Sequence, residues 1–600
     1  MTPSGERPAA DQQGATARVV LGLSGALGHD ASAALLIDGT VVAAAEEERF
    51  TRSKHAKGAM PLAAARFCLD FAGVAASDVQ VVAFPFAAIG LRSPARWHYA
   101  ARHWYAPDRA LDALLNGNRR FRRNRRRVRA MCAELGIAGA HVEFEFVEHH
   151  LAHAASAYHA SGFAGKCAIL GVDGKGEYAT TFFGYGEHGV IHRIAELYDP
   201  DSLSGVYGAM TQYLGFDMLD GEYKVMGMAP YGDPNKFDLS RLIRWDGSEM
   251  RVDTRLINTV GLRRYKEQGR GYYFSPALVA WLGPRRQGDE ADDPYVDYAA
   301  ALQQLYETRC LQLIERHLRG VLEETGQLVF AGGGALNVKL NQRILALPYV
   351  RSLFVQPAAG DAGTALGAAT FAAQRRGVNI APLRHVFLGP QFTTQQCIAA
   401  LQAHGHGVHW RRSGDIAGDV ARLLHAGHAV AWFQGRMEFG PRALGARSIL
   451  GCPSTAGIAD KINLQIKFRE RWRPFCPSVL PATARAMTGS EHPAPYMTIT
   501  FDVLPEWRAR IPEVVHADGT ARLQIVDAQT NPRYHALLVA MQALTGDGAV
   551  LNTSLNRRGE PIVCTPADAL TMFLGCDLAY LALEDVLVGK NAQDLMVCTA

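Results

Sequence analysis

The sequence VVLGLSGALGHDASAALLIDGTVVAAA, residues 19–45, contains three short apolar runs separated by polar turns. Runs of this length and composition predict β-strands at 19–23, 33–37 and 41–45. Asp38-Gly39, between the last two runs, is a strong signal for a tight hairpin turn. The chain is therefore expected to begin with a strand, a polar turn and a β-hairpin.

The residues that follow alternate between helix-like and strand-like patterns. Residues 60–73 have the spacing of an amphipathic helix, and residues 81–84 form another apolar run. The alternation continues to about residue 374, which predicts α/β architecture. Residues 377–391 contain glycines and prolines without a clear period, so we expect a linker there. The expected organisation is a disordered leader at 1–17, a first domain at 18–376 and a second α/β domain at 392–600.

Length and composition narrow the class of protein. A chain of 600 residues is too long for one core, and its net charge of +4 and 48% hydrophobic content are those of a soluble globular protein. No apolar run is long enough to span a bilayer, and the N-terminus has no apolar signal core. The ten cysteines include no Cys-x-x-Cys pair. We expect reduced thiols, a cytoplasmic location and no membrane partner.

The segment EHHLAHAASAY, residues 148–158, predicts a helix with two histidines on one face. His149 and His153 are four residues apart, which is about one helical turn. Asp173 follows an apolar run and is itself followed by Gly174 in the sequence GVDGKGE. A lone His-x-x-x-His pair is more often structural than metal-binding. The acidic loop at Asp173, together with a second one at Asp361, favours a metal site.

Two glycine-rich turns resemble phosphate-binding turns. The first, LVFAGGGALN at 328–337, is a strand, a glycine turn and a helix start; the second, at 355–367, has Asp361 at its tip. Free backbone N–H groups at a helix N-terminus favour an anion. Either turn alone is weak support, but their order behind the histidine helix indicates an enzyme that uses a nucleotide.

Arginines gather in several places. The run RRFRRNRRRVR, residues 119–129, favours a solvated basic helix over a nucleic-acid surface, because the protein as a whole is nearly neutral. Arginines beyond residue 391 stand among glycines, prolines and aromatics instead. Guanidinium groups held in this way suit the oxygens of phosphates and carboxylates. We therefore expect a compact anionic small molecule rather than nucleic acid.

Several motifs together resemble the NodU/CmcH-type O-carbamoyltransferase family. The similarity runs from Val19 to near the C-terminus. The motifs that carry it are HDASA at 29–33, AEEERF at 45–50, HHLAHAASA at 149–157, GPRALG at 440–445, the segment 467–475 and the segment 552–561. The arginine run at 119–129 matches no motif of this family.

The resemblance implies a fold and a reaction. It implies an actin-like ATPase domain, like that of the proteins that make threonylcarbamoyladenosine on tRNA, followed by a YrdC-like domain. In that scheme the second domain converts carbamoyl phosphate and ATP to carbamoyl-adenylate and pyrophosphate. The first domain then transfers the carbamoyl group to a small-molecule acceptor, usually through a hydroxyl, although a nitrogen is possible. The acceptor would be a natural product or sugar in secondary metabolism, such as antibiotic biosynthesis, and a homodimer is expected by analogy.

The resemblance also implies roles for individual residues. Fe(II), or less favourably zinc, would be held by His149, His153, Asp173 and Asp361, with Mg²⁺ accompanying ATP. His29 would be the general base, where the alternative is a turn histidine that caps a helix, and Lys54 would lie near the acceptor. Gly332, Gly333 and Asn337 would face the adenylate, with Gly174 in the neighbouring loop. The residues expected to hold carbamoyl phosphate and ATP are Lys467, Arg469, Arg533, Ser554, Asn556 and Arg558, together with Arg442 and Arg447, either of which could brace the domain instead.

Two other functions compete with this interpretation. One is a tRNA threonylcarbamoyladenosine synthase, for which the run at 119–129 is the only RNA-binding candidate. The other is a non-catalytic, actin-like nucleotide-binding scaffold. The scaffold would require the ligand set and the arginine clusters all to be structural.

Overall fold

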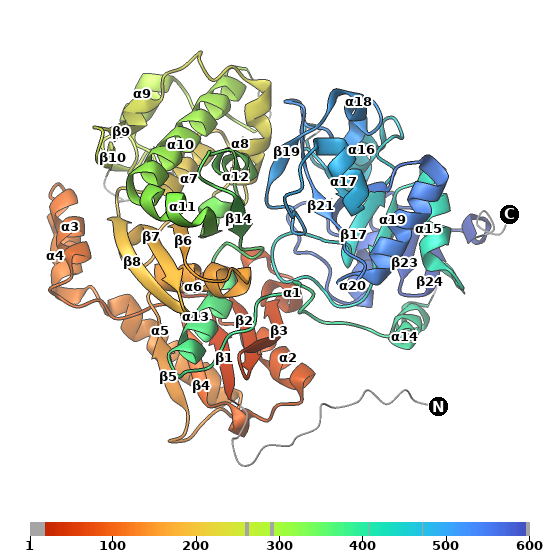
Figure 1. Ribbon diagram of the computed structural model, residues 1–600, viewed down its shortest axis with the longest axis horizontal. Coiled ribbons are helices and arrows are strands. Elements are labelled where there is room, and N and C mark those ends of the chain that lie inside the picture. Colours follow the sequence, from red (N-terminus) through yellow and green to blue (C-terminus); the bar gives the residue numbers. More distant parts are fainter. Residues whose placement is uncertain (1–17, 259–262, 289–292, 406, 471, 596–600) are drawn as a thin grey trace.

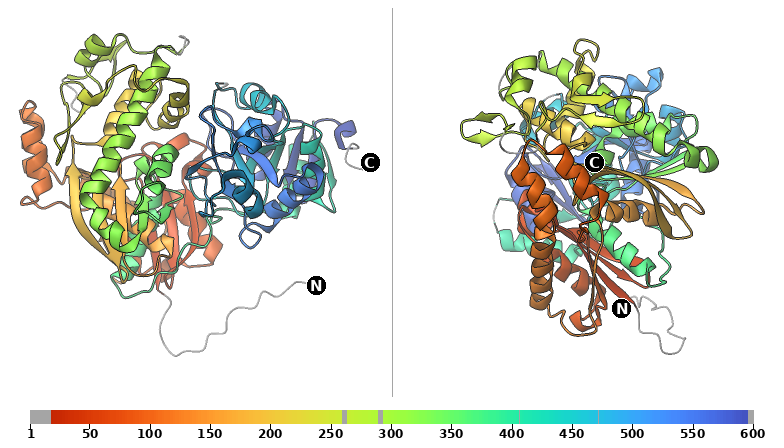
Figure 2. Two further views of the ribbon diagram at one scale, coloured as in Figure 1. Left: turned by 45° about the horizontal axis from the view of Figure 1, so that its top comes forward. Right: turned by 90° about the vertical axis from the view of Figure 1, so that its left-hand side faces the viewer.

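The computed structural model describes residues 18–595 apart from 259–262, 289–292, 406 and 471. The expected leader at 1–17 lies outside these residues. The described chain has an N-terminal part built on two five-stranded sheets and a C-terminal part built on an eight-stranded sheet. The two parts lie side by side (Figures 1 and 2).

The first sheet has the strand order β3-β2-β1-β4-β5. β1 runs antiparallel to β2 and parallel to β4. Asp38 and Gly39 form the expected hairpin turn with φ values of 47° and 79°, the left-handed region that such a turn requires. The strands are β1 (Val19–Leu23), β2 (Ser32–Ile37), β3 (Thr40–Glu46), β4 (Val81–Phe84) and β5 (Glu143–Phe146).

The second sheet repeats this arrangement, in the order β8-β7-β6-β13-β14. β6 is antiparallel to β7 and parallel to β13, as β1 is to β2 and β4. A duplicated sheet of this kind is the architecture of an actin-like domain, so the predicted fold class is confirmed. The strands are β6 (Cys167–Val172), β7 (Ala179–Glu187), β8 (Val190–Tyr198), β13 (Gln327–Ala331) and β14 (Ser352–Val355).

Two buried helices, α6 (His149–Ser161) and α13 (Gly363–Gln374), lie between the two sheets (Figure 1). α13 packs on β1, β2 and β4, whereas α6 packs on β6, β7 and β13. Their alanine-rich faces approach so closely that a Cβ on Gly367 would lie 1.8 Å from the carbonyl oxygen of Ala152. This packing holds the beginnings of both helices next to each other.

Helices and short strands complete the N-terminal part. α7, α8 and α10 pack together beyond the second sheet. The remaining elements are α1 (Glu48–Thr51), α2 (Leu62–Ala72), α3 (Pro94–Arg102), α4 (Pro107–Asn116), α5 (Arg119–Glu134), α7 (Leu203–Tyr213), α8 (Glu222–Met228), β9 (Ile243–Trp245), β10 (Met250–Val252), β11 (Lys266–Glu267), β12 (Arg270–Gly271), α9 (Pro276–Leu282), α10 (Tyr295–His317), α11 (Arg319–Thr325) and α12 (Val338–Leu345).

The arginine-rich run forms α5, as predicted. Seven of its arginines are exposed to solvent. Its buried face includes Asn124, Val128 and Met131. The expectation of a basic helix with a solvated face is therefore confirmed, and the helix is anchored by the few residues that are not arginine.

The C-terminal sheet is mixed, with the order β15-β24-β23-β16-β17-β22-β18-β21. Its strands are β15 (His409–Arg412), β16 (Val430–Phe433), β17 (Arg447–Gly451), β18 (Cys476–Val479), β21 (Gln524–Ile525), β22 (Ala549–Ser554), β23 (Tyr580–Leu583) and β24 (Val586–Gly589). β19 (Thr500–Asp502) and β20 (Thr520–Arg522) form a separate pair. The helices are α14 (Thr394–His404), α15 (Ile416–His425), α16 (Ile458–Lys461), α17 (Pro481–Thr488), α18 (Pro505–Arg508), α19 (Pro532–Thr545) and α20 (Pro566–Leu574).

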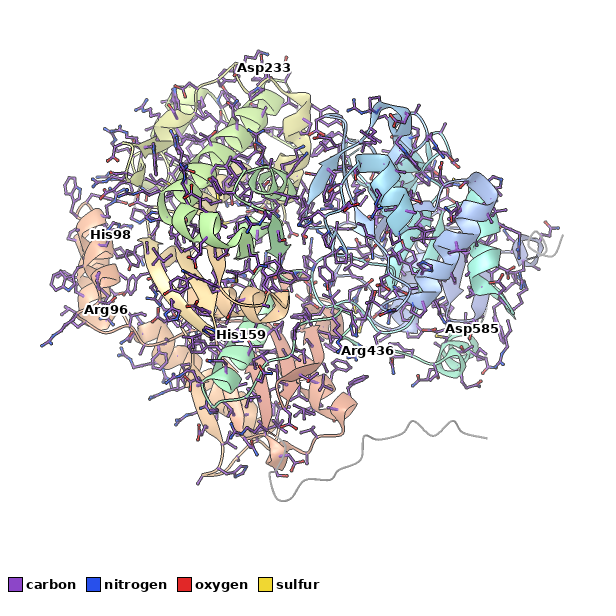
Figure 3. The ribbon with its side chains drawn as sticks, in the orientation of Figure 1. Arg96, His98, His159, Asp233, Arg436 and Asp585 are labelled. Atoms are coloured by element: carbon purple, nitrogen blue, oxygen red, sulfur yellow. The ribbon has the colours of Figure 1, made fainter. Side chains whose placement is uncertain are left out.

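The segment between α13 and α14 contains no helix or strand apart from one isolated bridge at Phe387. The expected linker at 377–391 falls within it, and the division into domains remains a prediction. Arg436, which lies at the junction of the two parts (Figure 3), donates hydrogen bonds to the carbonyl of Gly389 at 3.3 Å and to that of Val42 at 3.1 Å. The segment is thus tied to both parts.

Further hydrogen bonds join the two parts directly. The guanidinium of Arg52 donates to the carbonyl oxygens of Ile562 at 2.6 Å and Pro561 at 2.9 Å. The side-chain amide of Asn341 donates to the carbonyl of Thr498 at 2.8 Å. Loops from both parts can therefore contribute to one site.

Two expectations from composition can be compared with the described residues. The nine cysteines among them are buried and free of disulfides. Within the same residues, no helix combines the length and the apolar character that a membrane crossing requires.

Candidate metal centre and phosphate site

Four buried side chains converge where α6 and α13 begin. His149 and His153 lie on α6, Asp173 follows β6, and Asp361 precedes α13. One ligand atom from each lies within 4.8 Å of the others. His149 Nε2 is 3.4 Å from Asp361 Oδ1 and 3.6 Å from Asp173 Oδ2. The structure thus brings together all four residues expected to hold a metal.

Neighbouring groups orient these side chains. The amide of Gly333 donates to Asp173 Oδ1 at 2.8 Å, which leaves Oδ2 facing the centre. His149 Nδ1 lies 3.3 Å from the carbonyl oxygen of Pro85, so a proton on Nδ1 leaves the Nε2 lone pair directed inward. Asp361 Oδ2 is buried without a hydrogen-bond partner among the described residues. Two imidazoles and two carboxylates arranged in this way fit a divalent transition metal.

The charges of these groups are strongly coupled. Burial opposes ionisation of Asp361, but His149 and His29 outweigh it and hold the pKa of the carboxyl well below its usual range. For His149, burial opposes the charged form and Asp361 favours it, so the pKa of the imidazole is raised well above normal. The result is a dense, buried cluster of opposite charges. A cation bound there would lie among these groups.

A second group of polar residues extends from this centre. His29 Nδ1 lies 3.0 Å from Asp30 Oδ2 and 3.7 Å from Asp361 Oδ2. Asp30 Oδ1 accepts from His55 Nδ1 at 2.7 Å. His55 Nε2 is 3.2 Å from Asp220 Oδ1, and the ammonium of Lys54 pairs with the same carboxylate. His29 and Lys54 are therefore ends of one continuous polar chain.

The two histidines of this chain favour the charged form. Burial disfavours the imidazolium of His29, but Asp361 and Asp30 outweigh it and raise its pKa to about 9. Burial likewise opposes the charge on His55, whereas hydrogen bonds with Asp220 and Asp30 raise its pKa to about 10. The carboxylates set the protonation of both rings.

A cationic cluster lies in the C-terminal part around Lys467. Its ammonium donates to the carbonyl oxygen of Ser554 at 2.7 Å and to Asn556 Oδ1 at 2.7 Å. Burial, with Arg469 and Arg473 nearby, holds the pKa of Lys467 well below its usual range. Burial and Arg473 also lower the pKa of Arg469 to about 9. These cations destabilise one another until an anion joins them.

The N-terminal part adds three residues to this cluster. Lys54 is close enough to disfavour the charge on Lys467. The ring of Tyr223 lies 4.7 Å beneath the guanidinium of Arg473. Burial opposes ionisation of Tyr223, but Arg473, Lys54 and Lys224 outweigh it and lower its pKa. Both parts of the chain therefore build the cluster, with Lys54 joining it to the polar chain of His29.

Arg442 and Arg558 lie around the same cluster. Burial and the neighbouring Arg522 lower the pKa of Arg442 to about 9. Arg558 is more exposed, and its guanidinium approaches the carboxylate of Glu470 at 3.9 Å. Motif reasoning missed Tyr223, Lys224, Arg473 and Arg522, and the one signal for Arg473 was its place in the segment 467–475.

Two other residues of the expected set, Arg447 and Arg533, lie elsewhere. Arg447 is fully buried, and its guanidinium donates to backbone carbonyls that include Gln434 at 3.0 Å and Pro390 at 3.2 Å. Arg533 pairs with Glu584 at 3.0 Å and with Asp585 at 2.9 Å. These contacts brace the C-terminal sheet, which is the alternative role stated for Arg447, and a phosphate-binding role for either guanidinium stays a prediction.

The glycine turn after β13 contributes through its backbone. Gly332 has a φ of 91°, and a Cβ there would lie 2.2 Å from the carbonyl oxygen of Val172. The side chain of Asn337 is engaged elsewhere: it accepts the amide of Leu340 at the start of α12 and exchanges hydrogen bonds with Gln303. Gly174 has open space around its α-carbon. The backbone of the turn therefore holds Asp173 in place. The side-chain amide of Asn337 is already used in hydrogen bonds within the N-terminal part.

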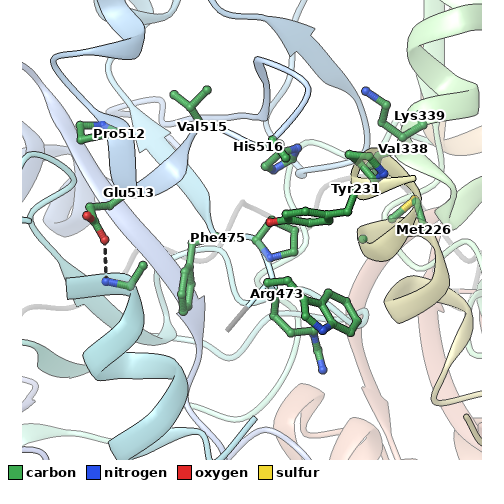
Figure 4. Close-up of a pocket in the computed structure, with 16 residues that line it drawn as sticks. Met226, Tyr231, Val338, Lys339, Arg473, Phe475, Pro512, Glu513, Val515 and His516 are labelled. Atoms are coloured by element: carbon green, nitrogen blue, oxygen red, sulfur yellow. Dashed lines mark hydrogen bonds between the residues drawn. The ribbon is translucent and has the colours of Figure 1, made fainter. Parts of the chain in front are cut away.

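A cavity of about 200 Å³ lies between the two parts (Figure 4). Arg473 joins it to the cationic cluster. Aromatic rings and polar groups line it, including those of Tyr231, Trp472, Phe475, Lys339 and His516. It is a second space, distinct from the four-ligand centre, with walls suited to a flat ring beside an anion.

Comparison with known families agrees with this two-part architecture. Residues 19–370 match the family "Carbamoyltransferase N-terminus", and residues 421–590 match "Carbamoyltransferase C-terminus". The chain belongs to the carbamoyltransferase family. The resemblance on which the expected site residues depend is thereby confirmed, although the roles of those residues are not tested by it.

Relatives of this carbamoyltransferase include nodulation proteins. It is 36% identical to nodulation protein NolNO of Sinorhizobium fredii over 94% of this chain and 79% of the relative. It is also 36% identical to nodulation protein NolO of Bradyrhizobium diazoefficiens, over 75% of this chain and 80% of that protein. An uncharacterized protein of Synechocystis is 36% identical over 96% and 97% of the two chains.

Among solved structures, full-length HypF in a phosphate- and nucleotide-bound form is similar to this carbamoyltransferase at a TM-score of 0.29. The sequences are 14% identical, and the similarity covers 60% of this chain and 55% of HypF.

Proposed function

We propose that this carbamoyltransferase is ATP-dependent and works through carbamoyl-adenylate. The observation that carries the proposal is the cluster of buried cations around Lys467, to which both parts of the chain contribute. Lys54 and His55 connect this cluster to His29 and the four-ligand centre. A cationic cluster and a candidate metal centre that are joined by contiguous polar contacts suit a reaction in two stages.

The first stage belongs to the cluster around Lys467. Carbamoyl phosphate would lose phosphate to water there and give carbamate, whose oxygen would attack the α-phosphorus of ATP and expel pyrophosphate. Lys467, Arg469 and Arg473 would offset the phosphate charge, with Ser554 and Asn556 orienting the ammonium. Arg469 Nη2 is buried without a partner among the described residues, so it is available to an incoming oxygen. Mg²⁺ would accompany ATP.

The second stage belongs to His29. Its Nδ1 faces Asp30 and Asp361, which leaves Nε2 to take the proton of an acceptor hydroxyl. The hydroxyl oxygen would bond to the carbamoyl carbon as the bond to AMP breaks. A divalent metal, for which the donor set of His149, His153, Asp173 and Asp361 fits Fe(II) or zinc, would supply Lewis acidity at this point. A general base must be neutral before it accepts a proton. A metal ion held by Asp173 and Asp361 would lower the pKa of His29 and so favour its neutral form.

The proposal extends to the biological setting. The acceptor would be a sugar or natural product carbamoylated on oxygen, or on nitrogen, in secondary metabolism. We expect the protein in the cytoplasm, as a homodimer, with domain boundaries at 18–376 and 392–600. Each of these is independent of the chemistry above.

The test is mass spectrometry of the purified protein with carbamoyl phosphate, ATP and Mg²⁺ but no acceptor. Enzyme-dependent carbamoyl-AMP and pyrophosphate are expected. Lys467→Met, which keeps the length of the buried chain, should reduce their formation at least 100-fold, whereas the exposed control Lys266→Met should not. A wild-type protein that leaves ATP intact, and that consumes ATP only with threonine, bicarbonate and tRNA, would instead establish the threonylcarbamoyladenosine reaction.

A further inference from the structure

α5 runs across the loops that carry the second-stage residues. The buried amide of Asn124 donates to the carbonyl of Ala26 at 3.0 Å, in the loop that leads to His29. One turn further on, Arg127 donates to the carbonyl of Gly58 at 2.6 Å, just after Lys54 and His55. Gly58 in turn donates to the carbonyl of Gly28 at 2.9 Å. The helix is therefore tied by hydrogen bonds to the loops that carry His29, Lys54 and His55.

The other end of the helix reaches the loop after Asp173. Arg120 is near enough to Lys175 for the two charges to disfavour each other. Lys175 belongs to the segment that separates the metal ligand Asp173 from Glu177, whose carboxylate accepts the amide of His149 at 3.2 Å. α5 thus spans from the loop beside the metal centre to the loop beside Lys54.

Three arginines share the side of α5 that follows this path. Arg120, Arg123 and Arg127 are three and four residues apart, so they form one stripe along the helix. Arg123 disfavours the charge on both of its neighbours in the stripe. No carboxylate within the described residues forms an ion pair with any of the three. The stripe is therefore cationic and has no carboxylate partner among the described residues. The hydrogen bonds of Asn124 and Arg127 fix its position.

We propose that the acceptor of this carbamoyltransferase carries an oxyanion, and that Arg120, Arg123 and Arg127 bind it while His29 faces the hydroxyl to be carbamoylated. This inference rests on the proposed function and adds the substrate class to it. Guanidinium groups bind phosphate, sulfate and carboxylate with paired N–H donors. An anion between them would offset the repulsion along the stripe.

The geometry favours a small anion over a polyanion. The stripe ends at the loop containing Gly58 on one side and near Lys175 on the other, so it is only about two helical turns long. The exposed arginines Arg122, Arg125 and Arg129 lie on the other side of α5, with the same spacing of three and four residues and away from this path. They provide matched controls with the same charge, on the same helix.

The experiment measures binding by isothermal titration calorimetry, with the cluster around Lys467 saturated by α,β-methylene-ATP. The probes are glycerol 3-phosphate, glycerate and glycerol, which share hydroxyls but carry a phosphate, a carboxylate or no charge. One additional site is expected for a charged probe and none for glycerol. Comparison of glycerol 3-phosphate with glycerate identifies the preferred oxyanion.

The variants then locate the site. Arg120→Gln/Arg123→Gln/Arg127→Gln should weaken binding of the charged probe at least tenfold, and Arg122→Gln/Arg125→Gln/Arg129→Gln should change it less than twofold. Equal loss in both variants, equal binding of glycerol, or no additional site would overturn the proposal. So would tight tRNA binding that both variants reduce equally, since that marks a polyanion surface. Carbamoyl-AMP formation without acceptor is measured separately. Failure of the proposed function can therefore be told apart from failure of the acceptor-site proposal.

Discussion

The Nε2 atoms of His149 and His153 lie 3.2 Å apart in a fully buried site. Two ring N–H groups cannot point at each other across this distance, so at least one of these nitrogens must offer a lone pair. Asp361 Oδ1 lies 3.4 Å from the first and 3.6 Å from the second. A cation shared by these three atoms would satisfy them together.

We therefore expect the purified protein to hold about one divalent metal ion per chain, measured by inductively coupled plasma mass spectrometry. Asp361→Asn should lose most of this metal, because it removes a charged ligand from the centre. His159→Gln changes another buried histidine of α6 (Figure 3) that lies outside the ligand set, and should retain it. Equal metal contents in these two variants would argue against the site.

His29→Gln should separate the two stages. Carbamoyl-AMP should still form, but its conversion to AMP should slow by roughly 10²–10⁴, the range for loss of a general base. Chromatography with mass spectrometry would follow the ratio of carbamoyl-AMP to AMP over time. The exposed control His141→Gln should behave as wild type. A variant that makes no adenylate at all would place His29 in the first stage instead.

The stability of the protein should depend on the charge of His55. Its folded pKa of about 10 is above the ordinary value of 6.5, so the folded state binds the proton more tightly than the unfolded state. The resulting stabilisation is complete below about pH 6.5 and is lost as the pH rises toward 10, with a slope of at most about 1.4 kcal/mol per pH unit. His55→Gln should flatten this part of the curve in urea unfolding at pH 6–10. An unchanged slope would mean that Asp30 and Asp220 do not hold the imidazolium.

The ion pair of Glu46 and Arg49 should matter for the junction between the two parts. Arg49 is 3% exposed and lies 3.1 Å from Glu46, and it also donates to the carbonyl of Gly440 at 3.0 Å. Arg49→Met would leave a buried carboxylate unpaired and should lower the free energy of unfolding by about 3–5 kcal/mol. Glu46→Gln/Arg49→Met should recover part of that loss in the same urea titration. If the double variant is no more stable than the single one, the contact with Gly440 matters more than the pair.

The sequence predicted local features well and long-range partners poorly. The strand at 19–23, the hairpin turn and the strand at 81–84 are where periodicity placed them, because strand patterns and turn residues are local signals. The spacing of His149 and His153 and the two acidic loops suggested a metal site, and the motif resemblance then specified the four-ligand set. Asp220 was missed because its contact with His55 joins segments 165 residues apart, and no local pattern encodes such a contact. The contacts of Arg447 with backbone carbonyls and of Arg533 with Glu584 and Asp585 were not predicted, because an arginine in a motif looks the same whatever oxygen it meets.

The position of Asp361 has a consequence for the growing polypeptide. His149, His153 and Asp173 emerge from the ribosome long before Asp361, and α13, which fixes Asp361, packs on strands from the beginning of the chain. The nascent chain consequently contains three of the four candidate ligands while the helical region between β8 and β13 is still being made. The four-ligand centre is complete only when α13 lies between the sheets, so an ion bound by all four residues would enter together with the completion of the N-terminal core, late in biosynthesis.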